Sequence, residues 1–165
     1  MKAAFIERTG GPEVLQFGEM PDPVAAPGEV VVDIVAASVN GADWKVRDGK
    51  SGQLARFPYI LGRDFSGVVS ALGEGVADLD VGDEVFGVCD VGQEGAYAQK
   101  IAIKAAIVAR KTDRLSHVDL SGVRAGELSD DGFRTPSPVT RCGQGPGRPP
   151  STIVVDGGCV FIRHG

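Results

Sequence analysis

Apolar and polar residues alternate in short runs over the first 120 residues, and glycines or prolines close most of these runs. Such runs predict short β-strands joined by tight turns. The longest run covers residues 30–39, where Asp33 interrupts apolar residues and indicates one face in contact with water. Further strands are predicted at 2–6, 66–72, 95–100, 101–103 and 107–108, and residues 81–87 are predicted to form a tight turn that leads into a strand. Residues 13–18 alternate with period two, which predicts a half-buried strand.

One segment departs from this pattern. Residues 41–48 could form two helical turns, which Gly49 ends, and Gly73-Glu74-Gly75 is typical of a turn. Many short strands, glycine-rich turns and a single short helix predict a mainly β protein, built as a partly open β-barrel.

The composition changes near residue 120. Residues 121–165 hold 9 of the 24 glycines and 5 of the 10 prolines, a density typical of disordered segments. We therefore expect a domain at 1–120 and an irregular, poorly ordered tail at 121–165. Only 152–155 and 160–162 in that tail have the pattern of strands.

Charge and length exclude several classes of protein. The net charge of -5 argues against nucleic-acid binding, because phosphate recognition needs a basic face. No apolar run approaches the ~20 residues of a membrane span, and the apolar stretch at the N-terminus is too short for a signal peptide. Three scattered cysteines do not make a disulfide framework, so we expect a cytoplasmic protein.

The motifs in the sequence do not indicate a metal site, a serine nucleophile or a phosphate-binding loop. Cys89 and His117 are the only thiol and imidazole in residues 1–120, and both lie outside the polar stretches described next, so a metal site is not expected. Ser66 lacks the Gly-x-Ser-x-Gly spacing of a nucleophile elbow, and His117 is expected to be exposed rather than a base. Glycine-rich residues 143–147 follow no strand and precede prolines, so they do not form a phosphate cradle.

Two polar stretches remain as candidates. At 38–45, Asn40 offers a donor and an acceptor at a strand end, Asp43 can cap the helix, and Lys45 can bring a cation to a phosphate or an enolate oxygen. The alternative is that Asn40 and Asp43 only cap the helix while Lys45 is solvated. The second stretch places Arg63 and Asp64 at the entry of a strand.

Four segments together resemble a known superfamily. They are KAAFIERTGGPEVLQFGEMPDP, APGEVVVDIVAASVNGADWKVRDG, PYILGRDFSGVVSALGEGV and VGDEVFG. In this order they are similar to the N-terminal GroES-like catalytic domain of medium-chain dehydrogenase/reductases, in the zinc-free quinone oxidoreductase and enone reductase branch. The resemblance covers about residues 1–118.

The resemblance implies that the catalytic zinc is absent. Asn40 stands where zinc-dependent members have a cysteine ligand, and Gly62-Arg63-Asp64 stands where they have Gly-His-Glu. A guanidinium stays protonated and has no lone pair for a metal. Arg63 and Asp64 are then expected to pair with each other, or to anchor a nearby loop, at the cleft side of the barrel.

The resemblance also implies an activity, in which NADPH delivers hydride to a quinone or an α,β-unsaturated carbonyl. Asn40 would lie beside the nicotinamide and the substrate. Lys45 matches a lysine that touches both cofactor and substrate in enone reductases with an Asp-aromatic-Lys sequence, which favours enones and alkenals. Both residues are thus expected in catalysis and in cofactor binding.

The resemblance stops near Asp119, before the Rossmann domain of the family. The tail, whose basic residues apart from histidine are all arginines, fits a truncated or frame-shifted reading of GC-rich coding sequence. We expect little NADPH affinity, negligible turnover and self-association through an uncovered interdomain face. Two alternatives are a non-catalytic GroES-like binding module and a half-enzyme that a second chain completes.

Overall fold

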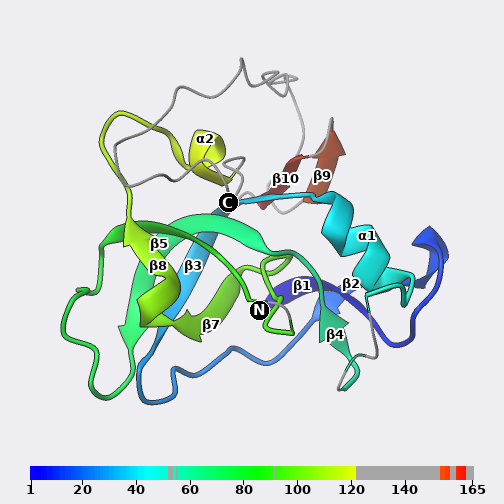
Figure 1. The fold of residues 1–165 in the computed structure, drawn as a ribbon, viewed down its shortest axis with the longest axis horizontal. Helices are drawn as coiled ribbons and strands as arrows, with labels where there is room; N and C mark the ends of the chain where they lie inside the picture. Colours follow the sequence, from blue (N-terminus) through cyan, green and yellow to red (C-terminus); the bar gives the residue numbers. More distant parts are fainter. Residues whose placement is uncertain (52–53, 55, 91, 122–152, 157–158, 163–165) are drawn as a thin grey trace.

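Two antiparallel sheets make up the computed structural model, which describes residues 1–51, 54, 56–90, 92–121, 153–156 and 159–162. The smaller sheet has the order β2–β1–β4 and the larger has β8–β6–β5–β3–β10–β9, with β7 also on β3 (Figure 1). The strands are β1 (Lys2–Ile6), β2 (Leu15–Glu19), β3 (Glu29–Ser38), β4 (Tyr59–Ile60), β5 (Asp64–Leu72), β6 (Glu84–Val88), β7 (Lys100–Lys104), β8 (Val108–Arg110), β9 (Ile153–Asp156) and β10 (Cys159–Ile162).

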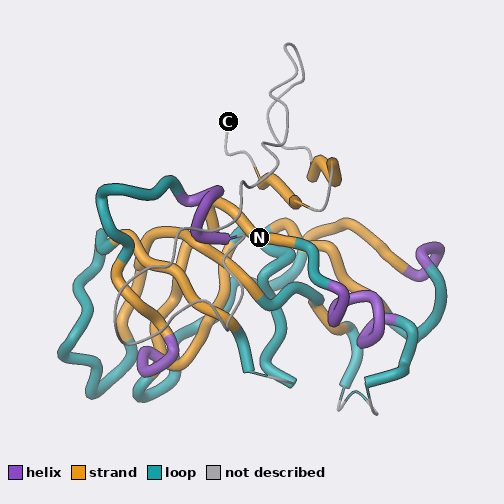
Figure 2. The backbone as a smooth tube through the Cα atoms, turned by 45° about the horizontal axis from the view of Figure 1, so that its top comes forward, coloured by secondary structure: helices purple, strands orange, loops and turns teal. Residues whose placement is uncertain are grey.

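Short helices occupy the rim of the sheets rather than their interior (Figure 2). They are α1 (Gly41–Arg47), α2 (His117–Ser121) and the 3-10 turns η1 (Pro12–Val14) and η2 (Ala105–Ile107). The larger sheet does not close on itself, and the two sheets share one apolar core to which β1, β3, β5 and β7 contribute. The predicted mainly β, partly open barrel with short helices is therefore confirmed.

β3 is the central strand of the larger sheet. One edge pairs with β5 from Val30 to Ala37, and the other pairs first with β7 and then with β10. Most of its residues are buried. Asp33 remains partly exposed and binds Lys100 Nζ at 2.7 Å, so the polar interruption seen in the sequence faces water and a cation.

The close pairing of β5 with β3 explains why residue 67 is a glycine. A side-chain carbon at Gly67 would lie 2.1 Å from the carbonyl oxygen of Asp33, so only glycine lets the two backbones approach here. The register of the pair also shifts beside this point, between Ile34 and Ala36. A bulge of this kind bends and twists a strand, which suits the end of a barrel.

The strand predicted at 95–100 is wrong, because only Ala98 forms an isolated bridge there, and β7 begins at Lys100. Several other strand boundaries differ from the predicted ones, and two of them matter most. β5 begins at Asp64 rather than residue 66, which places the Asp64 carboxyl inside the sheet, where it is 7% exposed. β2 begins at Leu15 after a 3-10 turn, and it is an edge strand. The predicted half-buried alternation over 13–18 is wrong, because Leu15 and Phe17 both remain exposed.

The two strand-like segments of the tail form β9 and β10, as predicted. They pair with each other, and β10 pairs with the end of β3, where Cys159 lies opposite Ser38. The other residues of the expected irregular tail, at 122–152, 157–158 and 163–165, lie outside the described residues. A boundary at residue 120 stays a prediction.

α2 lies over the ends of β3, β5 and β6 (Figure 1). Leu120 is buried there against Phe86, with Leu115 packed beside them. None of the helices in the described residues is long and apolar enough to cross a membrane.

Candidate functional site

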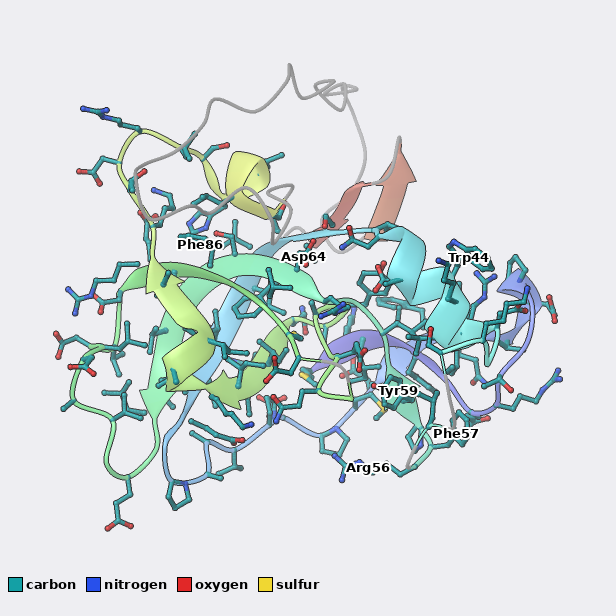
Figure 3. All side chains as sticks on the ribbon, viewed as in Figure 1. Trp44, Arg56, Phe57, Tyr59, Asp64 and Phe86 are labelled. Atoms are coloured by element: carbon teal, nitrogen blue, oxygen red, sulfur yellow. The ribbon has the colours of Figure 1, made fainter. Side chains whose placement is uncertain are left out.

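Three polar side chains meet where β3 ends and β5 begins. Ala37 lies opposite Phe65 in the sheet, so Ser38 and Asp64 are the next residues on the two strands. Asp64 Oδ2 accepts hydrogen bonds from Ser38 Oγ at 3.1 Å and from Asn40 Nδ2 at 2.6 Å. Figure 3 shows Asp64 close to the point where β3 leads into α1.

The amide of Asn40 has a fixed orientation. Its Nδ2 also donates to Ser38 Oγ at 3.3 Å, so both amide hydrogens have acceptors. A carboxylate can only accept hydrogen bonds, and the amide nitrogen must therefore face Asp64. The amide hydrogens of Asn40 are consequently committed to the protein.

Asp43 caps α1, as its position in the sequence predicts. Its Oδ2 accepts the backbone N–H of Asn40 at 2.7 Å and the hydroxyl of Tyr97 at 2.8 Å. Burial raises the pKa of the Asp43 carboxyl, the nearby charge of Asp64 adds to the rise, and the two hydrogen bonds oppose it. The other oxygen, Oδ1, is buried without a partner.

The position of the Tyr97 ring explains why the residue before Arg63 is a glycine. Gly62 has a φ of +92°, and a Cβ there would lie 2.3 Å from Cδ1 of the Tyr97 ring. Only glycine meets both conditions. Burial, followed by the charge of Asp43, raises the pKa of the Tyr97 phenol, so its hydroxyl stays a donor to Asp43.

Arg63 anchors a loop. Its Nε and Nη2 donate to the carbonyl oxygen of Cys89 at 3.1 and 2.8 Å, and the N–H of Cys89 donates back to the Arg63 carbonyl. Among the described residues Arg63 and Asp64 form no ion pair, so the expectation that they pair is wrong and the loop-anchor alternative holds. Burial raises the pKa of the Cys89 thiol to about 12, which keeps it neutral.

Lys45 lies apart from the Asn40–Asp64 hydrogen bonds, on the exposed side of α1. Its Nζ is 5.9 Å from the centre of the Trp44 ring, and Lys50 Nζ is 5.1 Å from it. The indole nitrogen of Trp44 lies near Gly41, the residue after Asn40, and the Trp44 side chain remains 43% exposed. An exposed aromatic ring with two neighbouring ammonium groups thus flanks the start of α1.

Sequence reasoning missed three polar residues. Ser38 belonged to the polar stretch before the helix but received no role, although its spacing from Asn40 was a usable signal. Tyr97 carried no signal, because it lies 54 positions from Asp43. His117 was expected to be exposed, and this is wrong: its side chain is 14% exposed and bonds to Ser66 and Glu84.

The described residues contain no group of three His, Cys, Asp or Glu side chains able to hold a metal ion. The polar groups gathered at the start of α1 are amide, hydroxyl, carboxyl and phenol. They form one connected hydrogen-bond network that holds the end of β3 against β5.

Comparison with known proteins identifies a family of domains. The model of the alcohol dehydrogenase GroES-like domain matches residues 26–132. Quinone oxidoreductase of Lama guanicoe is 34% identical over 100 residues, which are 60% of this chain and 30% of that protein. Human NAD(P)H oxidoreductase RTN4IP1 is 30% identical over 139 residues, covering 74% of this chain and 35% of that protein. The chain thus spans about a third of the length of the curated relatives it matches.

Solved structures agree with these relatives. The quinone oxidoreductase of Coxiella burnetii is 30% identical with a TM-score of 0.70, over 76% of this chain and 41% of that one. The Escherichia coli quinone oxidoreductase complexed with NADPH is 29% identical with a TM-score of 0.69, over 73% of this chain and 36% of that one.

Proposed function

Because this chain belongs to the alcohol dehydrogenase GroES-like domain family, in the quinone oxidoreductase branch of the medium-chain dehydrogenase/reductases, we propose that its barrel orients a quinone or an α,β-unsaturated carbonyl for reduction by NADPH. The relatives support the general class, an oxidoreductase catalytic domain. We propose in addition that the cofactor is NADPH, that the acceptor is a quinone or an α,β-unsaturated carbonyl, and that the reaction uses no zinc ion.

The hydrogen bond from Asn40 to Asp64, at 2.6 Å, carries the metal-free part of the proposal. The resemblance implies that Asn40 and Arg63 stand where zinc-dependent members of the superfamily have two zinc ligands. The amide nitrogen of Asn40 donates inward, and the guanidinium of Arg63 binds a carbonyl. Neither nitrogen has a lone pair for a cation, so the donor set does not suit zinc.

The same residues suit the nicotinamide end of NADPH. Bound NADPH supplies a hydride to the electron-poor carbon of the acceptor. Asn40 is half-buried and held by Ser38 and Asp64, so it can position a neighbouring flat ring without reorganisation. We assign Asn40 this positioning role beside the nicotinamide.

Lys45 is suited to a different role in the same reaction, which is to stabilise charge on the acceptor. Hydride addition leaves negative charge on the acceptor oxygen, and a cation or donor must stabilise that charge. The amide hydrogens of Asn40 and the hydroxyl of Tyr97 are already committed. The ammonium of Lys45 forms no ion pair among the described residues, so it is available for the oxygen, and Trp44 offers a flat face to the acceptor ring.

Trp44 provides a direct test, because it is the single tryptophan of the chain. We expect a soluble benzoquinone to quench its fluorescence along a saturating curve. Lys45→Met should weaken this binding by about threefold to tenfold, because the ammonium can then no longer donate a hydrogen bond to an oxygen of the quinone. Lys50→Met is the matched control, since Lys50 also lies over Trp44, and it should leave the affinity unchanged.

Free N-acetyltryptophanamide measured in parallel gives the purely collisional response. A linear quenching curve that matches this compound would contradict acceptor binding at α1. Equal losses from Lys45→Met and Lys50→Met would contradict the specific role of Lys45 and leave only a general charge effect.

A further inference from the structure

A turn at the end of α1 brings Lys50 back beside Lys45. Gly49 has a φ of +77°, and its N–H donates to the carbonyl oxygen of Val46 at 3.1 Å. The N–H of Lys50 donates to the carbonyl oxygen of Lys45 at 2.8 Å. This pair of hydrogen bonds is the Schellman motif, which reverses the chain after a helix. The backbone itself therefore places the second lysine next to the first.

Both ammonium groups lie near the ring of Trp44. Lys45 Nζ and Lys50 Nζ are 5.9 and 5.1 Å from the centre of that ring, and both lysines are exposed. An acceptor that receives a hydride needs one cation for the charge that develops on its oxygen. The exposed indole has two cations beside it, so one of them has no role in the reduction of a neutral acceptor.

Only part of this positive charge is balanced within the protein. Asp48 forms an ion pair with Lys50, and this bond lowers the pKa of the Asp48 carboxyl. Lys45 forms no ion pair in the described part of the chain, and Arg47 is directed to a backbone carbonyl. Residues 44–50 contain three basic side chains and one acidic one, whereas the whole protein has a net charge of -5. The end of α1 is therefore a positively charged place on an acidic protein.

We propose that the acceptor carries a permanent negative charge, as a carboxylate or phosphate group does, and that Lys50 binds this group while the acceptor ring lies against Trp44. This inference rests on the proposed function, in which Lys45 stabilises the reacting oxygen. An ammonium has three N–H donors, so Lys50 can keep its bond to Asp48 and still donate to the acceptor. A negative group near both lysines also reduces the repulsion between them. Lys50 thus selects anionic acceptors over neutral ones.

Two anthraquinones that differ only in charge test this preference on the full 165-residue protein. Anthraquinone-2-sulfonate is anionic and anthraquinone-2-sulfonamide is neutral, while their flat rings are the same. Quenching of Trp44 fluorescence should give an affinity about threefold to fivefold higher for the sulfonate at low salt, which is the size expected of an exposed ion pair. About 0.5 M NaCl should remove this difference, because salt screens exposed charges.

Three variants assign the preference to single residues. Lys50→Met should lower the preference for the sulfonate to less than about twofold. Asp48→Asn should raise it by about twofold, because this change removes the carboxylate that competes for Lys50. Lys104→Met is the matched control, since Lys104 is exposed and lies opposite Glu29, at the other end of β3 from α1. It should leave the preference unchanged.

The outcomes separate this inference from the proposed function. Equal affinities of the wild type for the two anthraquinones would overturn the anionic preference and leave the acceptor site in place. A preference that persists in Lys50→Met would also overturn it, as would an equal loss in Lys104→Met, because net charge alone would then explain the binding. Failure of benzoquinone and of both anthraquinones to bind would contradict the acceptor site itself, and the anionic preference with it.

Discussion

The two carboxylate oxygens of Asp43 have unequal surroundings. Oδ2 accepts from the Asn40 backbone and the Tyr97 hydroxyl, while Oδ1 is buried without a partner. One oxygen therefore makes the contacts that hold the start of α1, and the other contributes an uncompensated buried charge. Burial raises the pKa of Asp43 for this reason.

Asp43→Asn separates the effect of the two hydrogen bonds from the effect of the buried charge. An amide oxygen in place of Oδ2 can accept both hydrogen bonds, and the amide cannot titrate. Because the folded protein raises the pKa of Asp43, its contribution to stability is complete below the ordinary aspartate range and is lost as the pH rises through the raised value. We expect Asp43→Asn to gain stability relative to the wild type as the pH rises above the ordinary aspartate range, which thermal unfolding measures as a function of pH.

Asp43→Ala serves as the comparison, since it removes the acceptor for both donors and should lower the free energy of unfolding by about 2 kcal/mol or more. Equal pH profiles for wild type and Asp43→Asn would contradict a raised pKa at this position.

At the scale of elements, Gly62 decides how β4 passes into β5. The turn needs a positive φ and leaves no space for a side chain beside Tyr97. It also places Arg63 against the carbonyl of Cys89 and directs Asp64 into the sheet. The position of the candidate site thus depends on a residue that has no side chain.

Gly62→Ala should destabilise the barrel by more than about 3 kcal/mol, because it combines an unfavourable φ with an overlap on the Tyr97 ring. Gly75→Ala is the matched control, with a φ of +83° and open space around the new carbon. It should cost only about 1 kcal/mol. Urea unfolding of both variants measures the difference, and similar losses would show that the Tyr97 contact is unimportant.

At the scale of the whole molecule, the barrel offers side chains for the reacting end of the cofactor and the acceptor. The sequence contains no glycine fingerprint between a strand and a helix, which is the usual cradle for a dinucleotide pyrophosphate. We propose that this cradle comes from a nucleotide-binding domain beyond the barrel, consistent with the greater length of the relatives.

The 165 residues by themselves should therefore bind NADPH weakly and show negligible turnover. Isothermal titration calorimetry with NADPH should give no binding at micromolar concentrations, with the benzoquinone titration of Trp44 as the control for a folded acceptor site. Saturable micromolar NADPH binding would contradict the proposed division of the site.

Local pattern determined most of the strands, helix α1 and the capping role of Asp43, because period-two runs and a strand-to-helix boundary depend on residues close in sequence. It did not determine β4 or α2, and it predicted a strand at 95–100 that does not form. Only the tertiary structure decided the partners of the polar groups. Asp64 with Asn40, Tyr97 with Asp43, and His117 with Ser66 are 24, 54 and 51 residues apart. Such pairs arise from strand register and from the path of loops around the barrel, and no local run of residues encodes either.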